Sequence, residues 1–148
     1  MIRFVLLFLL LPFFVAAQIP KAKPNTYVND YTGWLSEVQV QVLNEQILHL
    51  EKTTSVQLAV LLINRLPVKM EIEEYAREVG NQWKVGKNFR GLVYVAAVDD
   101  RRHRLEVGHN LEGDIPDITA LAILDSAKPY LIQQEYYEAV HHLVDAIQ

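Results

Sequence analysis

The stretch of sequence that decides the fold reads GLVYVAAVDDRRHRLEV, from Gly91 to Val107. Its first part, Gly91 to Val98, is apolar throughout, which is typical of a strand buried on both faces of a parallel sheet. A polar turn, DDRR, then leads into residues 103–107, where Leu105 and Val107 alternate with charged side chains. This alternation predicts an antiparallel edge strand that a hairpin joins to the buried strand.

A second apolar run, VQLAVLLI, covers Val56 to Ile63 upstream. Apolar residues at helical spacing predict a helix over Ile72 to Lys84, between the two runs. The order strand, helix, strand makes the two strands parallel through a right-handed crossover. Helical spacing also predicts an earlier helix from Ser36, which is placed to cap its first turn, to about Thr53.

Two more helices are predicted after the hairpin. Gly108 to Pro116 forms a loop, after which Asp117 is placed to cap a helix that runs to about Lys128, where Pro129 stops it. A last helix is predicted over Gln134 to Ile147. The sum is an α/β fold: a three-layer α/β/α sandwich around a small mixed, mostly parallel sheet with an antiparallel edge hairpin.

The first residues have the pattern of a signal peptide. Arg3 supplies a positive charge, Phe4 to Val15 form an apolar run, and Val15 and Ala17 place small residues at −3 and −1 of a cut before Gln18. The run is shorter than the roughly 20 apolar residues that span a bilayer. We therefore predict a signal peptide at residues 1–17, an exported product that is periplasmic or secreted, and no transmembrane anchor after cleavage.

Composition limits the remaining functions. Residues 18–26 contain Pro20 and Pro24 and are predicted to be a linker that does not pack, which leaves 27–148 as one domain. The formal net charge of the 148-residue chain is −4, without the runs of Lys and Arg that nucleic-acid binding demands. The chain has no Cys, which excludes thiol nucleophiles and Cys-ligated zinc. We expect a monomer.

Four stretches carry a family resemblance. They are YVNDYTGWLS at Tyr27 to Ser36, VQLAVLLI followed by IEEYA at Ile72 to Ala76, WKVGKNFRGLVYVAAVDDRRHRLEVG at Trp83 to Gly108, and LEGDIPD at Leu111 to Asp117. In this order they resemble the TPM domain, a family of exported or thylakoid-lumen proteins. The sequence departs from the family at Asn110, where the family loop usually has a glycine. The resemblance implies acid phosphatase activity in some members, divalent-cation binding in others, and assembly or repair roles elsewhere.

Carboxylates are the strongest candidates for a site, because the Walker loop, HExxH and Gly-x-Ser-x-Gly motifs are missing. Asp99 and Asp100 follow the second buried strand, and Asp30 precedes the first helix, so all three fall at the carboxyl edge of the sheet. Oxygen ligands without Cys suit Ca²⁺ or Mg²⁺. Glu112 and Asp117 are further candidate ligands: the family pattern favours them, but the edge strand delivers their loop to the opposite end. A loop of about eight extended residues can retrace roughly 26 Å.

Plain structural roles compete with metal binding for the same residues. Asp99 and Asp100 suit a hairpin turn, Asp117 a helix cap, and Asp30 an Asx turn. His109 is a candidate acid or base in the loop. The two tryptophans, Trp34 and Trp83, are expected to be anchors in the core or at its edge.

The sequence leaves two candidate functions open. The first is a divalent-cation-binding module that docks on an envelope protein partner and has an accessory, assembly or repair role in the cell envelope. The alternative is a metal-assisted acid phosphatase, a phosphomonoester hydrolase in which Arg101 or Arg102 stabilises charge.

Overall fold

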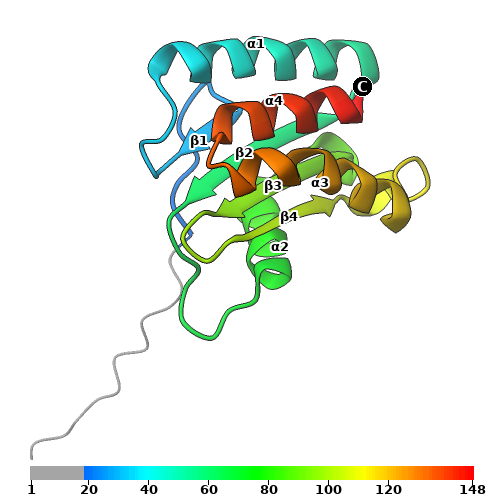
Figure 1. Cartoon of the computed structure of the whole chain (residues 1–148). Coiled ribbons are helices and arrows are strands. Elements are labelled where there is room, and N and C mark those ends of the chain that lie inside the picture. The colour runs from blue at the N-terminus through cyan, green and yellow to red at the C-terminus, as the bar shows by residue number, and fades with distance from the viewer. Residues whose placement is uncertain (1–18) are drawn as a thin grey trace, which may run out of the picture.

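A four-stranded sheet with the order β1-β2-β3-β4 forms the middle layer of the molecule (Figure 1). The structure, a computed structural model, describes residues 19–148, so the predicted signal peptide lies outside the described residues. Strands β1 (Val28–Asp30), β2 (Gln57–Ile63) and β3 (Gly91–Ala97) are parallel, and β4 (Arg102–Val107) is antiparallel to β3. The predicted parallel pair and edge hairpin are confirmed, whereas β1 was not predicted.

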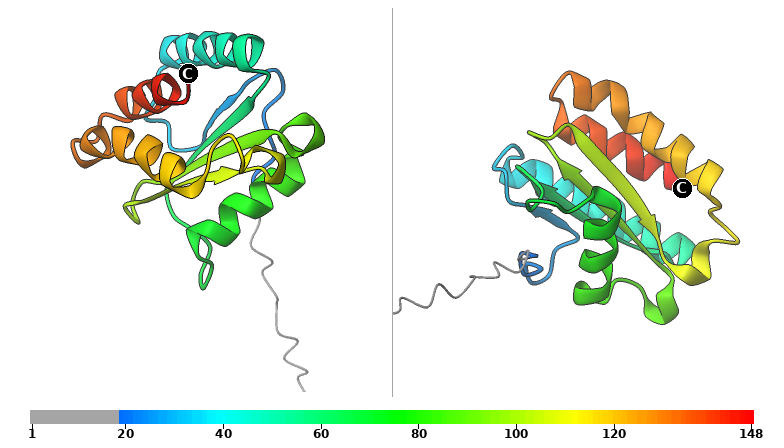
Figure 2. Two further views of the ribbon diagram at one scale, coloured as in Figure 1. Left: turned by 90° about the vertical axis from the view of Figure 1, so that its right-hand side faces the viewer. Right: turned by 90° about the horizontal axis from the view of Figure 1, so that it is seen from below.

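Helices cover both faces of the sheet. Helix α2 (Ile72–Trp83) lies on one face, and α1 (Glu37–Thr54), α3 (Asp117–Ile132) and α4 (Tyr136–Ile147) lie on the other (Figures 1 and 2). Short 3-10 turns, η1 and η2, occupy Lys87–Phe89 and His109–Leu111. The predicted three-layer sandwich is therefore confirmed. No helix within residues 19–148 is long and apolar enough to cross a membrane.

Alternation along the central strands divides the core in two. Leu62 and Tyr94 pack toward α1, α3 and α4, whereas Leu61 and Val95 pack toward α2. Every residue of β3 is buried, because helices cover both of its faces. This double burial explains the continuous apolar runs.

The two predicted helix boundaries that depended on caps had different outcomes. Ser36 caps α1 through a capping box with Gln39, as expected. In α3, however, Pro116 holds the N-cap position and Asp117 is the first helical residue, without a side-chain cap.

Pro129 lies inside α3, so the predicted stop at Lys128 is wrong. Proline removes only one backbone N–H from the helix, and its unpaired partner, the carbonyl of Asp125, lies on an exposed residue that water can reach.

The segment that precedes the domain packs against it. Ile19 is buried with the residues of the α2 side, and the indole N–H of Trp83 donates to the carbonyl of Pro20 at 2.9 Å. The backbone N–H of Lys23 donates to the buried side chain of Asn29 at 2.7 Å. The expectation that this segment does not pack is therefore wrong for Ile19, whereas residues 21–25 are exposed. Prolines extend the chain, but they do not prevent an apolar neighbour from being buried.

Asn44 of α1 holds β1 in place. Its side-chain oxygen accepts hydrogen bonds from the backbone N–H groups of Tyr27 and Val28 at 2.9 and 3.0 Å. Its amide nitrogen donates to the hydroxyl of Thr26 at 2.9 Å. A side chain from α1 thus accepts hydrogen bonds from the backbone N–H groups at the outer edge of this short strand.

Candidate functional site

The carboxyl edge of the sheet holds three of the predicted acidic residues. Asp30 ends β1, and Asp99 and Asp100 follow β3, so the topology places them at one edge as expected. One carboxylate oxygen of Asp30 accepts from the backbone of Thr32 at 2.8 Å and of Gly33 at 3.2 Å. The other accepts from the backbone of Leu35 at 2.9 Å. Asp30 therefore forms the turn that leads into α1.

Asp99 and Asp100 also have partners within the protein. Asp100 accepts from the backbone N–H of Leu66 at 2.7 Å, and Asp99 lies 3.6 Å from the guanidinium of Arg65. Both contacts join the loop after β2 to the turn after β3. Since β2 separates β1 from β3, Asp30 lies about two strand spacings, roughly 10 Å, from this turn.

Glu112 and Asp117 lie at the opposite edge. The backbone N–H of Gly108 donates to the carbonyl of Gly91 at 2.8 Å, so the chain leaves β4 beside the start of β3. Glu112 contacts the ring of His109 at 3.1 Å there, and Asp117 begins α3. Across the described range, residues 19–148, no group of three or more His, Cys, Asp or Glu residues lies close enough to hold a metal ion. The Ca²⁺ or Mg²⁺ site stays a prediction.

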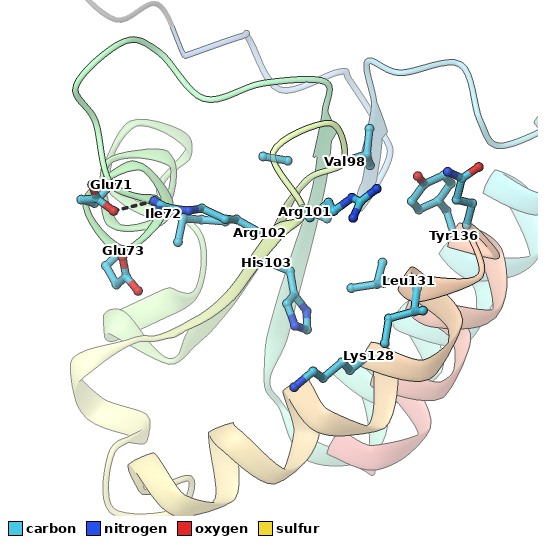
Figure 3. A pocket seen from close by; sticks show the side chains of 14 residues that line it. Glu71, Ile72, Glu73, Val98, Arg101, Arg102, His103, Lys128, Leu131 and Tyr136 are labelled. Atoms are coloured by element: carbon cyan, nitrogen blue, oxygen red, sulfur yellow. Dashed lines mark hydrogen bonds and ion pairs between the residues drawn. The ribbon is translucent and has the colours of Figure 1, made fainter.

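A cavity of about 630 Å³ opens at the carboxyl edge, around the turn between β3 and β4 (Figure 3). It extends from the start of α2 past the hairpin to the end of α3 and the start of α4. Its polar and aromatic lining includes Glu71, Arg101, Arg102, His103, Lys128 and Tyr136. Ile72, Leu131 and Ile132 add apolar surface. A cavity of this size suits a small-molecule ligand.

Charges of both signs line this cavity: Arg101, Arg102 and Lys128 are the cations, and Glu71 and Glu73 are the acids. The guanidinium of Arg102 pairs with Glu71, and Figure 3 shows it directed toward α2. Arg101 points instead toward Tyr136 (Figure 3), and it is held at a left-handed φ of 54° by the hairpin. Arg101 and Lys128 make no ion pair with any of residues 19–148. Two cations are therefore free to meet an anion.

His103 adds a hydrogen-bond donor between these cations. The hydroxyl of Tyr94 lies 3.3 Å from Nδ1 of His103, and Tyr94 is fully buried. Burial raises the pKa of the Tyr94 phenol, so the phenol stays protonated and its proton needs an acceptor. Nδ1 of His103 is that acceptor, which places the imidazole proton on Nε2.

The surroundings of His103 favour the uncharged form of its imidazole. Burial lowers its pKa below the ordinary value, the nearby Lys128 lowers it further, and Asp125 opposes the change. In Figure 3 the ring points toward Lys128 of α3. His103 can therefore donate a hydrogen bond to an anion, and it can take up a proton once negative charge enters the cavity.

Part of this site was visible in the sequence and part was not. Arg101 and Arg102 were candidates from the start. His103 shares its face of β4 with Leu105, and the period-two alternation of the strand was a signal that its side chain turns inward. Lys128 and Tyr136 come from helices that the sequence could not place beside the hairpin.

The fold and the cavity define a class of protein: an α/β fold with a cavity at the carboxyl edge of a four-stranded mixed sheet. The chain belongs to the TPM domain family, whose family model matches residues 28–148. The resemblance seen in the sequence is thereby confirmed.

Solved structures of similar proteins have the same fold. The N-terminal domain of a protein from P. gingivalis is 31% identical with a TM-score of 0.73, over 82% of this chain and 79% of that chain. The N-terminal domain of the cg2496 protein from Corynebacterium glutamicum is 18% identical, with a TM-score of 0.70 over 90% of this chain and 84% of that one. The BA42 protein from the psychrophilic bacterium Bizionia argentinensis is 18% identical, with a TM-score of 0.66 over 79% of each chain. No curated protein matches the chain.

Proposed function

We propose that this protein is an exported TPM-domain protein that binds a small phosphate-bearing ligand in the cavity around the β3–β4 turn. The observation that carries the proposal is the pair of uncompensated cations, Arg101 and Lys128, on either side of His103. A guanidinium offers a planar pair of donors, an ammonium offers a point charge, and a neutral imidazole offers one N–H. Phosphate, with several charged oxygens, can use all three.

This geometry favours the phosphate chemistry of the second sequence-derived function over the first. Three cations and two acids line the cavity, and one of the acids, Glu71, is paired with Arg102. The carboxylates of Asp30, Asp99 and Asp100, in contrast, each have a contact in a turn or loop. Hydrolysis of a phosphomonoester is the catalytic form of the proposal. His103 supports it, because a neutral imidazole in a ligand cavity is suited to proton transfer. An accessory role in the cell envelope rests on the predicted export.

Divalent-cation binding is a second proposal, supported by the placement of Asp30, Asp99 and Asp100 at one edge. A cation that binds only the native state stabilises it by about 2.7 kcal/mol at a hundredfold excess over its dissociation constant. Melting temperatures with chelator and with millimolar Ca²⁺ or Mg²⁺ test this. A rise that Asp99→Asn diminishes supports the site. Identical melting leaves these carboxylates as turn formers alone.

The phosphate proposal is tested by calorimetric titration of the purified protein with inorganic phosphate. Arg101→Gln and Lys128→Gln should each weaken binding about tenfold or more, because each removes a charge-assisted hydrogen bond. Lys52→Gln is the matched control, since it removes one cation from an exposed position on α1, away from the cavity. The proposal would be contradicted if all three variants bound phosphate with the same affinity, or if the wild type did not bind it. Turnover of p-nitrophenyl phosphate by the same samples separates binding from hydrolysis.

A further inference from the structure

We infer that the ligand carries an aromatic ring as well as a phosphate, and that this ring stacks on Trp34. The inference rests on the proposed phosphate site and adds the chemical class of the group attached to the phosphate. It comes from an indole at the surface that is joined, through one buried aromatic ring, to the wall of the cavity.

Trp34 is the exposed member of this aromatic pair. Its side chain lies in the loop before α1, and the residue is 52% exposed. Its ring centroid is 5.0 Å from that of Tyr136, with an angle of 61° between the planes. Tyr136 is only 8% exposed, and it lines the cavity. The indole therefore extends the cavity wall outward as an aromatic surface.

The other tryptophan shows what a structural indole looks like in this protein. The ring of Trp83 packs with the apolar residues of the α2 side, and its N–H donates to the carbonyl of Pro20. The indole N–H of Trp34, in contrast, has no hydrogen-bond partner among residues 19–148. Of the expected places for Trp34, in the core or at its edge, the structure shows the edge, where the indole contacts Tyr136. Half of this large apolar side chain remains in water, where it can be covered by a ligand.

The cationic side chains of the cavity and the indole of Trp34 lie on different sides of Tyr136. Figure 3 shows Arg101 directed across the cavity toward Tyr136, with His103 and Lys128 further along the wall. Trp34 contacts Tyr136 from outside that set of lining residues. A ligand that reaches both elements has a phosphate at one end and a flat ring at the other. Nucleoside monophosphates and aryl phosphates share this chemistry, and the volume of about 630 Å³ admits either.

The experiment compares four ligands with the purified protein: inorganic phosphate, ribose 5-phosphate, adenosine 5′-monophosphate and phenyl phosphate. Affinity is measured by calorimetry, and tryptophan fluorescence reports stacking. We expect at least one of the ring-bearing phosphates to bind about tenfold more tightly than ribose 5-phosphate, the scale that base stacking on an aromatic side chain provides. A preference for the adenosine compound assigns a nucleotide, and a preference for phenyl phosphate assigns an aryl phosphate.

Variants separate this inference from the proposed phosphate site. Trp34→Leu should abolish both the fluorescence quenching and the tenfold preference while leaving the affinity for inorganic phosphate unchanged. Trp34→Phe, which keeps an aromatic face, should restore most of the preference. If phosphate binds but the ring adds no affinity, or if Trp34→Leu keeps the preference, the inference is overturned and the phosphate site stands. If none of the four ligands binds, the proposed function fails.

Discussion

At the scale of single residues, His103 links the cavity to pH. Because burial and Lys128 lower its pKa from the ordinary value of 6.5, the unfolded chain binds its proton more readily than the folded protein does. The contribution of this residue to stability is therefore present above pH 6.5 and is lost as the pH falls toward the lowered pKa. Tyr94, Lys128 and Asp125 are the groups that face the imidazole.

The prediction is a difference between wild type and His103→Gln. Urea denaturation at pH 7.5 and pH 5 should show a larger loss of unfolding free energy for the wild type, since glutamine does not titrate. All other side chains are identical in the two proteins, so their contributions cancel in the comparison. Equal losses in the two proteins would contradict the lowered pKa.

Gly86 is a residue where a side chain has no room. It adopts a left-handed φ of 83°, and a Cβ there would lie 2.3 Å from the backbone nitrogen of Gly91. Gly86→Ala should therefore reduce the unfolding free energy by about 3 kcal/mol through strain and overlap. Gly113→Ala is the matched control, because nothing lies within 4 Å of a Cβ there, and it should change stability by less than about 0.5 kcal/mol. Thermal or urea denaturation of both variants measures the two changes in unfolding free energy. Equal changes would contradict the prediction.

At the scale of the elements, β1 depends on Asn44. Asn44→Ala leaves the backbone N–H groups of Tyr27 and Val28 without their acceptor, which should reduce the unfolding free energy by about 3 kcal/mol. Asn44→Asp keeps the accepting oxygen and should cost less than half as much. Hydrogen exchange gives a local measure: the amides of residues 27 and 28 should lose protection in the alanine variant and keep it in the aspartate variant. Unchanged protection in Asn44→Ala would mean that pairing with β2 alone orders the strand.

The same strand shows why the sequence predicted some elements and missed others. Runs such as Gly91 to Val98 predict their strand because burial on both faces requires an apolar residue at every position. β1 contains Asn29 and Asp30, residues that are rare in strands, and it forms through pairing with β2 and the contact with Asn44. Its order comes from the tertiary structure and leaves no pattern in the local sequence. The continuation of α3 past Pro129 depends in the same way on the packing of the helix.

The candidate site, too, is predictable where it depends on strand order and unpredictable where it depends on the packing of helices. Residues on the hairpin, such as Arg101 and Arg102, could be named from the sequence because strand order alone brings the β3–β4 turn to the carboxyl edge. Lys128 and Tyr136 join them only because α3 and α4 pack beside β4. Glu112 and Asp117 lie at the opposite edge because β4 ends beside the start of β3, and α3 begins there.

At the scale of the whole molecule, the main untested prediction is export. Protein recovered from the native host should have an intact mass that lacks residues 1–17, because Val15 and Ala17 fit the small positions before the cut. Replacement of the small residue at the cut, Ala17→Phe, should leave the precursor uncleaved. Recovery of a wild-type product that keeps Phe4 to Val15 would indicate an anchor instead of a signal peptide.

The buried Ile19 sets an order of events for that processing. Proteases bind their substrates as extended segments that add to a strand or groove, so the residues around a cut must be free of the folded domain. Ile19 follows the predicted cut before Gln18 and lies against the α2 layer with 8% of its surface exposed. Cleavage and completion of the fold therefore compete for the same residue. If the predicted cut is used, the peptidase acts while this end of the chain is still undocked, and a domain that folds early would block that cut.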